Sequence, residues 1–338
     1  MPAPAEDPAE AAFRNLIDFA ARAADPSLTE AADRLAVEVC GEFVRSGVPF
    51  VLMKGPALAR LLYREGEQRR YMDVDVLLGP GARGRAASVL ERLGFENATA
   101  AAGVDDFTGA VPAETWMRDR DLPVDLHTRF PGAGAPADET WRHLTQGLQA
   151  IVVNGQELPV FGRPALALHL AVHAAQHGPN DPKAIGDLRR GLSRWSSSDW
   201  QAAAVLAERL EAVGPFGAGL RLVPAGEDLA AGLDLPPSAG AAWEIEHRWT
   251  RPRGNFHLAA LEGVRHPGDL IALLRRALLP RPEWIVREFR WAGRGRTMLA
   301  AGYVRHALRL PCWTARAWSY RRRMRRATRA ANRERPSV

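Results

Sequence analysis

The chain has 338 residues, of which 46% are hydrophobic and 25% are charged, proportions that are ordinary for a globular protein long enough to form two domains. No apolar run approaches the roughly 18 to 20 residues that a membrane-spanning helix needs. The acidic, Pro/Ala-rich N-terminus lacks the basic and apolar regions of a secretory signal, so we expect a cytoplasmic protein.

The net charge of +6 is unevenly distributed along the chain. Arginine supplies nearly all of the 45 basic residues, because lysine occurs only at Lys54 and Lys183, and the basic excess is concentrated in residues 287–335. Abundant Ala, Gly and Pro accompany this bias, which indicates GC-rich coding, so charge alone does not indicate nucleic-acid binding. Cys40 and Cys312 match no zinc spacing or disulfide framework.

The first part of the chain predicts alternating helices and strands. Residues 9–46 have helical periodicity, residues 49–53 are a short apolar run typical of a buried strand, and Gly55-Pro56 turns the chain into a second helix. The elements expected next are a strand at 72–78, a helix at 81–95 that Gly94 closes, and a strand at 122–130. This order favours an α/β layer arrangement.

A Pro/Gly/Ala-rich segment at 131–139 is the best candidate for a domain boundary. A hairpin is expected around 151–161, and the chain beyond it is predicted to be mainly helical, with 3.6-residue periodicity at 166–177, 199–213, 241–249 and 269–279. We therefore expect N-terminal helices at 1–46, an α/β domain at 47–132, a mainly helical domain at 140–310 and a basic tail at 311–338.

Two aspartates in the second predicted strand carry the chemical signal. Asp73 and Asp75 stand two residues apart, so both side chains project from one face of the strand, about 6 to 7 Å apart along the chain. Carboxylates on one face repel each other unless they meet water or a cation, whereas Val74 and Val76 point into a core. Asp125 in the later strand can join the pair if the two strands are neighbours. Such carboxylate oxygens are suited to Mg²⁺.

Three carboxylates around two Mg²⁺ or Mn²⁺ ions are what in-line nucleotidyl transfer requires, because the ions activate the attacking hydroxyl and neutralise the triphosphate and its pyrophosphate leaving group. In this interpretation Asp73 and Asp75 bind both ions, while Asp125 completes one site and accepts the proton of the nucleophile. A lone D-x-D is more often a solvated strand edge. The strand, Gly turn and helix before it, and the D-x-H strand after it, favour the catalytic interpretation.

Residues 51–95 resemble the opening of the uncharacterised nucleotidyltransferase-like family, and the resemblance extends over about 35–195. The residues that carry it are Lys54-Gly55, Tyr63, Arg69, Asp73, Asp75, Gly94 and Asp125-Leu126-His127. The resemblance implies an α+β fold of the polymerase β superfamily, with a small mixed sheet and helices on one face, followed here by a mainly helical domain. The usual Gly-Gly or Gly-Ser turn is replaced by Lys54-Gly55-Pro56, in which Pro56 lacks an N–H that could hold a phosphate.

Nucleotide binding is expected at Lys54 and Gly55 of this turn and at Arg69 and Arg70. Lys54 can act as a point charge on phosphate, and its presence in a chain that otherwise uses arginine suggests that arginine would not serve there. Arg69 and Arg70 precede Asp73 by four and three residues, so either can add a second cationic contact. They fit solvated loop residues equally well.

A stripe of histidines follows in the helical region. His169, His173 and His177 share one helix face at i, i+4 and i+8, and with Asp187 nearby zinc is conceivable, but the apolar residues of the same helix favour packing or capping. The resemblance implies that His173, His177 and Asp187 approach the substrate cleft, with His127, and contact base, ribose or acceptor.

The expected function is Mg²⁺-dependent transfer of a nucleoside monophosphate from an NTP to a small-molecule, peptide or protein acceptor. The alternatives are a nucleotide-binding sensor or scaffold with this fold and little catalysis, and an RNA-modifying transferase that uses the basic tail. The C-terminal segment at 284–330 mixes Trp with Arg in an amphipathic pattern, for which we favour a helix packed on its Trp/Leu side, followed by a solvated tail. An anionic membrane surface, RNA or an acidic partner are the other interpretations.

Overall fold

A computed structural model describes the residues in the ranges 25–101, 113–118, 121–237, 267–280 and 282–333. The helix expected at 241–249 and the beginning of the helical region expected at 9–46 lie outside the described residues.

Within the described residues, seven strands form one mixed sheet in the order β3-β4-β5-β2-β1-β7-β6. Strand β2 is parallel to β5 and β1 is parallel to β7, while the other neighbours are antiparallel. The strands are β1 (Phe50–Leu52), β2 (Val74–Leu78), β3 (Glu96–Asn97), β4 (Glu114–Met117), β5 (Val124–His127), β6 (Gln149–Val153) and β7 (Gln156–Val160). The strands expected at 49–53, 72–78 and 122–130 are therefore confirmed, each in a shorter form.

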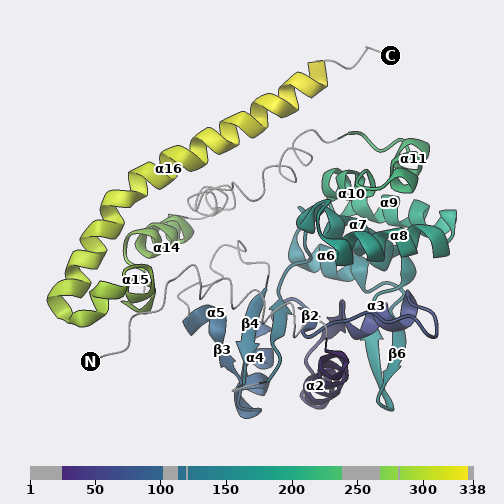
Figure 1. The fold of residues 1–338 in the computed structure, drawn as a ribbon, viewed down its shortest axis with the longest axis horizontal. Helices are drawn as coiled ribbons and strands as arrows, with labels where there is room; N and C mark the ends of the chain where they lie inside the picture. Colours follow the sequence, from purple (N-terminus) through teal and green to yellow (C-terminus); the bar gives the residue numbers. More distant parts are fainter. Residues whose placement is uncertain (1–24, 102–112, 119–120, 238–266, 281, 334–338) are drawn as a thin grey trace.

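Helices surround this sheet and continue the chain beyond it (Figure 1). Those that precede or interrupt the sheet are α2 (Pro26–Arg45), α3 (Pro56–Leu61), α4 (Arg83–Arg92), α5 (Ala98–Ala101) and α6 (Ala137–Leu144). Those that follow it are α7 (Arg163–His177), α8 (Pro182–Arg194), α9 (Ser197–Arg209), α10 (Val213–Leu220) and α11 (Pro224–Gly232). The C-terminal elements are α14 (Pro267–Leu278), α15 (Pro282–Glu288), the 3-10 helix η2 (Arg290–Arg294) and α16 (Arg296–Arg333).

The hairpin of β6 and β7 extends the sheet beyond β1. Its turn is Asn154-Gly155, in which both residues have positive φ, as a two-residue hairpin turn requires. Leu52 of β1 lies opposite Val160 of β7, so the sheet continues past the segment 131–139 at which the sequence predicts a boundary. We propose that the boundary between the sheet unit and the helices lies instead near Gly162, between β7 and α7.

Alternate side chains of the central strands enter two separate cores. Val74 and Val76 pack with α2 and α4 on one face of the sheet. Val51 and Leu77 point to the opposite face, where the helices that include α3 and α7 cover them. Because side chains alternate along a strand, Asp75 lies on the same face as Leu77, towards the helices that follow the sheet. The acidic residues therefore lie between the two parts of the fold.

Helix α7 is the centre of the helical part. It is buried along most of its length and packs against α8, α9 and α10. Gly219 of α10 lies against the backbone of Ala171 in α7, where a Cβ atom would collide with the Ala171 carbonyl group. This close approach fixes α10 on α7.

The C-terminal elements have a small core of their own. Ile285, Phe289 and Ala292 are buried together between α15, η2 and α16. In the part of the chain that the structure describes, no helix combines the length and the apolar character that crossing a membrane demands.

Candidate metal centre

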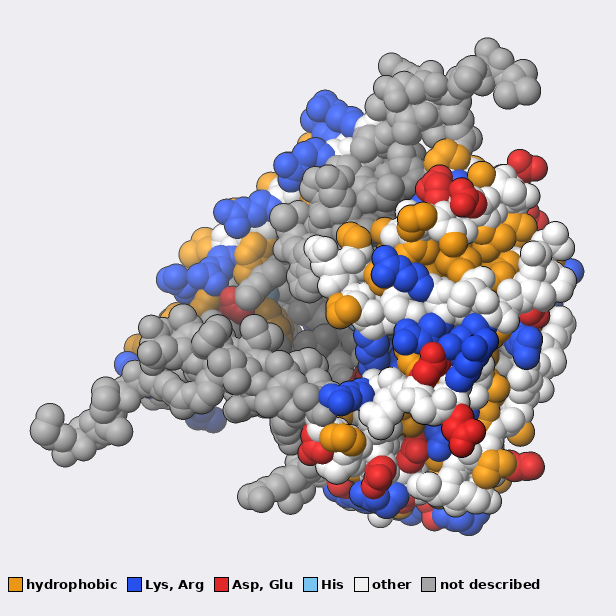
Figure 2. Space-filling view, turned by 45° about the vertical axis from the view of Figure 1, so that its right-hand side comes forward, with side chains coloured by type: hydrophobic (Ala, Val, Ile, Leu, Met, Phe, Trp, Pro, Cys, Tyr) orange, Lys and Arg blue, Asp and Glu red, His pale blue; other side chains and the backbone are white. Residues whose placement is uncertain are grey.

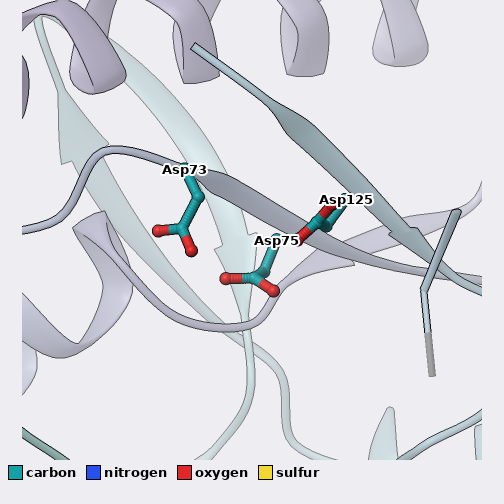
Figure 3. A group of neighbouring side chains, drawn as sticks. All are labelled: Asp73, Asp75 and Asp125. Carbon is teal, nitrogen blue, oxygen red and sulfur yellow. The ribbon is translucent and has the colours of Figure 1, made fainter. Parts of the chain in front are cut away.

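Asp73, Asp75 and Asp125 form one cluster at the centre of the sheet. Parallel pairing of β2 and β5 places Asp75 directly opposite Asp125, and Asp73 immediately precedes β2. One carboxylate oxygen from each residue lies within 4.8 Å of the others, and Figure 3 shows the three groups side by side. Among the described residues this is the one group of three or more His, Cys, Asp or Glu side chains with a geometry that could hold a metal ion. The expected convergence of the three aspartates is confirmed.

The contacts of Asp75 favour a cation at this cluster. Asp75 is only 2% exposed, whereas Asp73 and Asp125 are half-buried. Lys54 Nζ donates to Asp75 Oδ1 at 2.7 Å, and His127 Nε2 lies 3.0 Å from the same oxygen. The second oxygen, Oδ2, is buried and has no hydrogen-bond partner among the described residues. A buried carboxylate oxygen without a partner is costly, so its position fits that of a metal ligand.

The three carboxyl groups differ in acidity. Burial raises the pKa of Asp73 and of Asp125, and the charge on Asp75 raises both further. Burial also acts to raise the pKa of Asp75, but the charge of Lys54 and the hydrogen bond from His127 hold it well below its usual range. The cluster therefore contains one strongly acidic group beside two whose ionised forms need a further positive charge. A divalent cation would supply that charge.

The turn after β1 places Lys54 against the acids. Because β1 is antiparallel to β2, with Leu52 opposite Val76, Lys54 follows β1 at the end of β2 where the aspartates lie. Gly55 has φ of +49°, and a Cβ atom there would lie 3.2 Å from the Tyr71 ring and 3.4 Å from the carbonyl oxygen of Asp73. Glycine thus satisfies both the backbone conformation and the close packing of this turn.

Arg69 and Asp187 form a buried ion pair, which differs from the sequence expectation for both. Arg69 is 5% exposed, and its Nε and Nη2 atoms donate to the Asp187 carboxylate at 2.8 to 3.2 Å. Tyr63 donates its hydroxyl to the same carboxylate at 2.6 Å, and burial together with Asp187 raises the pKa of Tyr63 to about 12. Arg69 is therefore not a solvated cation available to a nucleotide. Asp187, which is fully buried, is not exposed in a cleft.

The four remaining candidates lie in different surroundings. Arg70 is exposed, and its charge acts on Asp25 at the start of α2. His127 is buried against Asp75 and so belongs to the acidic cluster. His173 is buried, and burial together with the charge of Lys54 lowers its pKa, whereas the side chain of His177 is 42% exposed. That both approach the substrate cleft stays a prediction.

The histidine stripe packs rather than forming a metal site in the described structure. His169 and His173 stack with ring centroids 5.6 Å apart, and both are buried. Burial lowers the pKa of His169 to about 3 and that of His173 well below its usual range, so both are neutral at physiological pH. His177 Nδ1 lies 2.8 Å from an oxygen of Asp181, the residue that caps α8. The arrangement supports the packing and capping interpretation over zinc.

Lys183 is a candidate that the sequence expectations missed. It lies in the first turn of α8, one turn before Asp187, and so on the same side of that helix. Burial and Asp75 raise the pKa of Asp73, and Lys183 is the strongest of the cations that act in the opposite direction, followed by Lys54. The sequence feature that could have indicated Lys183 is the rarity of lysine, because Lys54 and Lys183 are the two lysines of a chain that otherwise uses arginine. In the structure both act on the pKa of Asp73.

Comparison with known families gives the class of the protein. The family described as "Uncharacterised nucleotidyltransferase" matches residues 10–225, well over half of the chain. The chain belongs to this family. The sequence resemblance and the assignment to the nucleotidyltransferase enzymes are thereby confirmed. The matched region contains the whole sheet, the three aspartates, and both lysines of this nucleotidyltransferase.

Similar solved structures include two of the antibiotic-resistance factor ANT(2'')-Ia. Its solution structure is 17% identical, with a TM-score of 0.37, over 54% of this chain and 96% of that one. Its crystal structure with adenylyl-2''-tobramycin is 16% identical, with a TM-score of 0.39, over 52% and 97%. An antigenic nucleotidyltransferase-like protein from Paracoccidioides brasiliensis is 16% identical, with a TM-score of 0.32, over 62% and 93%. Likeness at this level does not carry over a substrate. No curated protein matches the chain.

Proposed function

We propose that this nucleotidyltransferase moves a nucleoside monophosphate from an NTP to a hydroxyl or phosphate group of a small molecule, peptide or protein. Asp73, Asp75 and Asp125 would hold two Mg²⁺ or Mn²⁺ ions. The observation that carries the proposal is the parallel register of β2 and β5, which brings the three carboxylates within 4.8 Å of one another. Oxygen ligands at this separation suit hard divalent cations.

Divalent ions bound here would lower the pKa of the attacking hydroxyl and neutralise the triphosphate. The protein's own groups are arranged to support that chemistry. Thr115 donates its hydroxyl to Asp125 Oδ1 at 2.7 Å and so fixes the orientation of this carboxylate. We assign Asp125 to the acceptor side, where its carboxylate would complete one metal site and accept the proton of the nucleophile. His127 and Lys54 orient Asp75.

We assign Lys54 and Lys183 to the triphosphate. They come from the turn after β1 and from the first turn of α8, and both act on the pKa of Asp73. An ammonium group is a compact point charge that can follow a phosphate as it moves, which the fixed fork of arginine cannot do as readily. Gly55 allows the close turn that presents Lys54. Because Pro56 lacks an N–H, side-chain cations take a larger share of phosphate binding.

We assign positioning roles to the buried pair. Arg69 joins the segment before Asp73 to α8 through Asp187, so it holds Lys183 in place. His177 is the histidine of the stripe with substantial exposure, and it remains a candidate contact for base, ribose or acceptor. Arg70, which is exposed, remains a candidate cationic contact for the nucleotide.

Pyrophosphate release tests the proposal. Each of the common NTPs is incubated with the protein, Mg²⁺ and a mixture of small metabolites and peptides as the source of acceptor. Asp75→Asn and Asp125→Asn are expected to lower the rate about 100-fold or more, because each removes a metal ligand. Asp234→Asn is the matched control, since Asp234 is outside the cluster and its φ of +52° suits asparagine. Equal rates for the cluster variants and the wild type would reject the assignment.

A nucleotide sensor with the same fold is a second candidate, favoured by the Lys54–Asp75 ion pair. A lysine ammonium already occupies one oxygen of the most acidic ligand, at 2.7 Å, where it competes with a metal ion for that carboxylate. Calorimetry separates the two functions. A sensor binds NTP with Mg²⁺ and releases no pyrophosphate, whereas the enzyme binds NTP and releases pyrophosphate.

A further inference from the structure

The last helix concentrates positive charge to an unusual degree. Helix α16 contains 11 arginines and no acidic residue in its 38 residues. The other 300 residues contain 34 basic and 39 acidic residues, so the rest of the chain has a small negative charge. In Figure 2 this helix is the diagonal at the upper left, where basic side chains alternate with hydrophobic ones. Its charge is therefore a property of one element rather than of the whole surface.

An apolar stripe runs along the exposed side of α16. It consists of Val304, Leu308, Pro311, Ala315 and Trp318, which follow one another at alternating intervals of four and three residues. This spacing puts them on one face of the helix. All five are exposed, and the exposed fractions of Val304, Leu308 and Trp318 are 61%, 75% and 57%. The sequence favoured a helix packed on its Trp/Leu side. Leu299 and Trp313 do pack, against the small C-terminal core and Trp284, whereas the exposure of Leu308 and Trp318 corrects the expectation for this part of the helix.

The opposite side of α16 explains why the stripe faces outwards. His306, Ala317 and Tyr320 are buried, and His306 Nε2 lies 2.7 Å from the carbonyl oxygen of Ala277 in α14. The stripe continues onto α14, because Leu278 lines the same groove as Pro311 and Trp318. Leu278 is itself exposed. The apolar surface thus spans α14 and α16, which the contact between His306 and Ala277 joins on the side opposite the stripe.

Arginines border this stripe. Arg305, Arg316 and Arg323 are exposed on the helix face next to the stripe. The Arg322 guanidinium lies 5.2 Å from the ring centroid of Trp318. An arginine that covers an apolar ring with its side chain keeps its charge at the surface. The stripe is thus an apolar strip with a cationic rim.

We propose that α16 lies flat on an anionic lipid surface, with the stripe at the boundary between headgroups and acyl chains and the arginines among the headgroups. Charge complementarity selects this occupant, because an acid-free helix with many arginines attracts anionic headgroups. A second copy of the chain is disfavoured, because facing stripes would bring two such sets of arginines together. Nucleic acid would account for the arginines but not for exposed Val304 and Leu308, since single-stranded bases stack on aromatic rings. An amphipathic helix rich in Arg, Leu and Trp matches the chemistry of interfacial lipid binding.

Flotation of the full-length protein with vesicles tests this proposal. Vesicles of phosphatidylcholine with about one-third phosphatidylglycerol are compared with vesicles of phosphatidylcholine alone. The expected result is flotation with the anionic vesicles only, weakened by high salt. Val304→Ser/Leu308→Gln/Trp318→Ser is expected to reduce partitioning about tenfold or more, because it removes the buried apolar area. Arg316→Gln/Arg323→Gln is expected to reduce it as well.

The matched control is Val44→Ser/Val152→Gln/Val205→Ser, which removes exposed apolar side chains outside α16. It should float like the wild type, and circular dichroism checks that every variant is folded. No flotation of the wild type, or equal flotation of the stripe variant, would overturn the proposal. Two other results would also overturn it. One is salt-sensitive binding of an RNA oligonucleotide that the stripe substitutions leave unchanged, in the absence of flotation. The other is a dimer in sedimentation that the stripe substitutions dissociate, again without vesicle binding.

Discussion

Asp75 of β2 and Asp125 of β5 are register partners on two adjacent parallel strands. Their separation is therefore set by backbone pairing rather than by a loop, and the pairing continues through Leu77 and His127, which lie opposite each other two residues further on. Asp73 adds the third carboxylate from the residue before the strand. Ligands fixed in this way need little rearrangement when a cation binds.

Asp73→Asn and Asp75→Asn are predicted to differ in their effect on stability, because only the second should lower it. Burial and Asp75 raise the pKa of Asp73 above that of the unfolded chain, so stability falls as the pH rises from the unfolded value to the raised value, and the full cost remains at neutral pH. A neutral amide removes that cost, and the metal-free Tm should stay the same or rise. Asp75→Asn leaves Lys54 and His127 without their carboxylate and should lower the Tm. Thermal unfolding with a chelator at neutral pH checks both, and a lower Tm for Asp73→Asn would contradict the account.

His169 is predicted to make the fold sensitive to mild acid. Its pKa is lowered to about 3 by burial, below the ordinary value of about 6.5, so the unfolded chain binds a proton that the folded chain does not. The free energy of unfolding should therefore fall as the pH drops from about 6.5 towards 3, and His169 alone should account for a loss of about 2 kcal/mol at pH 5. His169→Leu should reduce this slope without abolishing it, because His173 is also buried. Urea unfolding at several pH values measures the slope, and an unchanged slope would exclude His169 as its source.

Gly55→Ala is predicted to destabilise the protein more than Gly66→Ala. Both glycines have positive φ, but a Cβ atom at position 55 meets Tyr71 and Asp73, whereas nothing lies within 4 Å at position 66. Gly55 also has ψ of −111°, a backbone conformation outside the left-handed helical region, so its strain adds to the cost of the contact. Gly55→Ala should also lower activity, since it displaces Lys54. Equal free energies of unfolding would show that the contact is relieved at no cost.

Removal of one partner from the Arg69–Asp187 pair is predicted to cost about 3 to 5 kcal/mol of unfolding free energy, because the remaining charge is buried. Arg69→Met and Asp187→Leu are compared singly and together by chemical denaturation. The double variant should lose much less than the sum of the two single losses, as expected for groups in direct contact. Strict additivity would show that the pair is not coupled.

Lys183→Met is predicted to raise the KM for NTP about tenfold with a smaller change in kcat, as removal of a ground-state contact to phosphate would do. Lys183→Arg should restore part of the affinity, because the charge is retained. Steady-state kinetics measure both variants. A variant with unchanged KM would remove Lys183 from the nucleotide site.

The sequence predicts the parts of the fold that depend on local pattern. Alternation in Met72–Leu78 places Val74 and Val76 in one core and the aspartates on the opposite face, as the structure confirms. It does not predict long-range partners. Arg69 resembles a loop residue in the sequence because Asp187, the carboxylate with which it pairs, is 118 positions away. The parallel pairing of β7 with β1 likewise joins two segments whose local sequences do not indicate each other as partners. Burial of His173 likewise depends on how α7 packs, which its own periodicity does not specify.

The most direct test of the metal centre is Mn²⁺ binding followed by electron paramagnetic resonance, in the presence of a non-hydrolysable NTP. The wild type is expected to bind Mn²⁺ and to broaden its signal, whereas Asp125→Asn should bind it at least about tenfold more weakly, because a ligand oxygen is lost. Asp234→Asn should behave as the wild type. Equal Mn²⁺ affinity in the wild type and in Asp125→Asn would contradict a shared site built from β2 and β5.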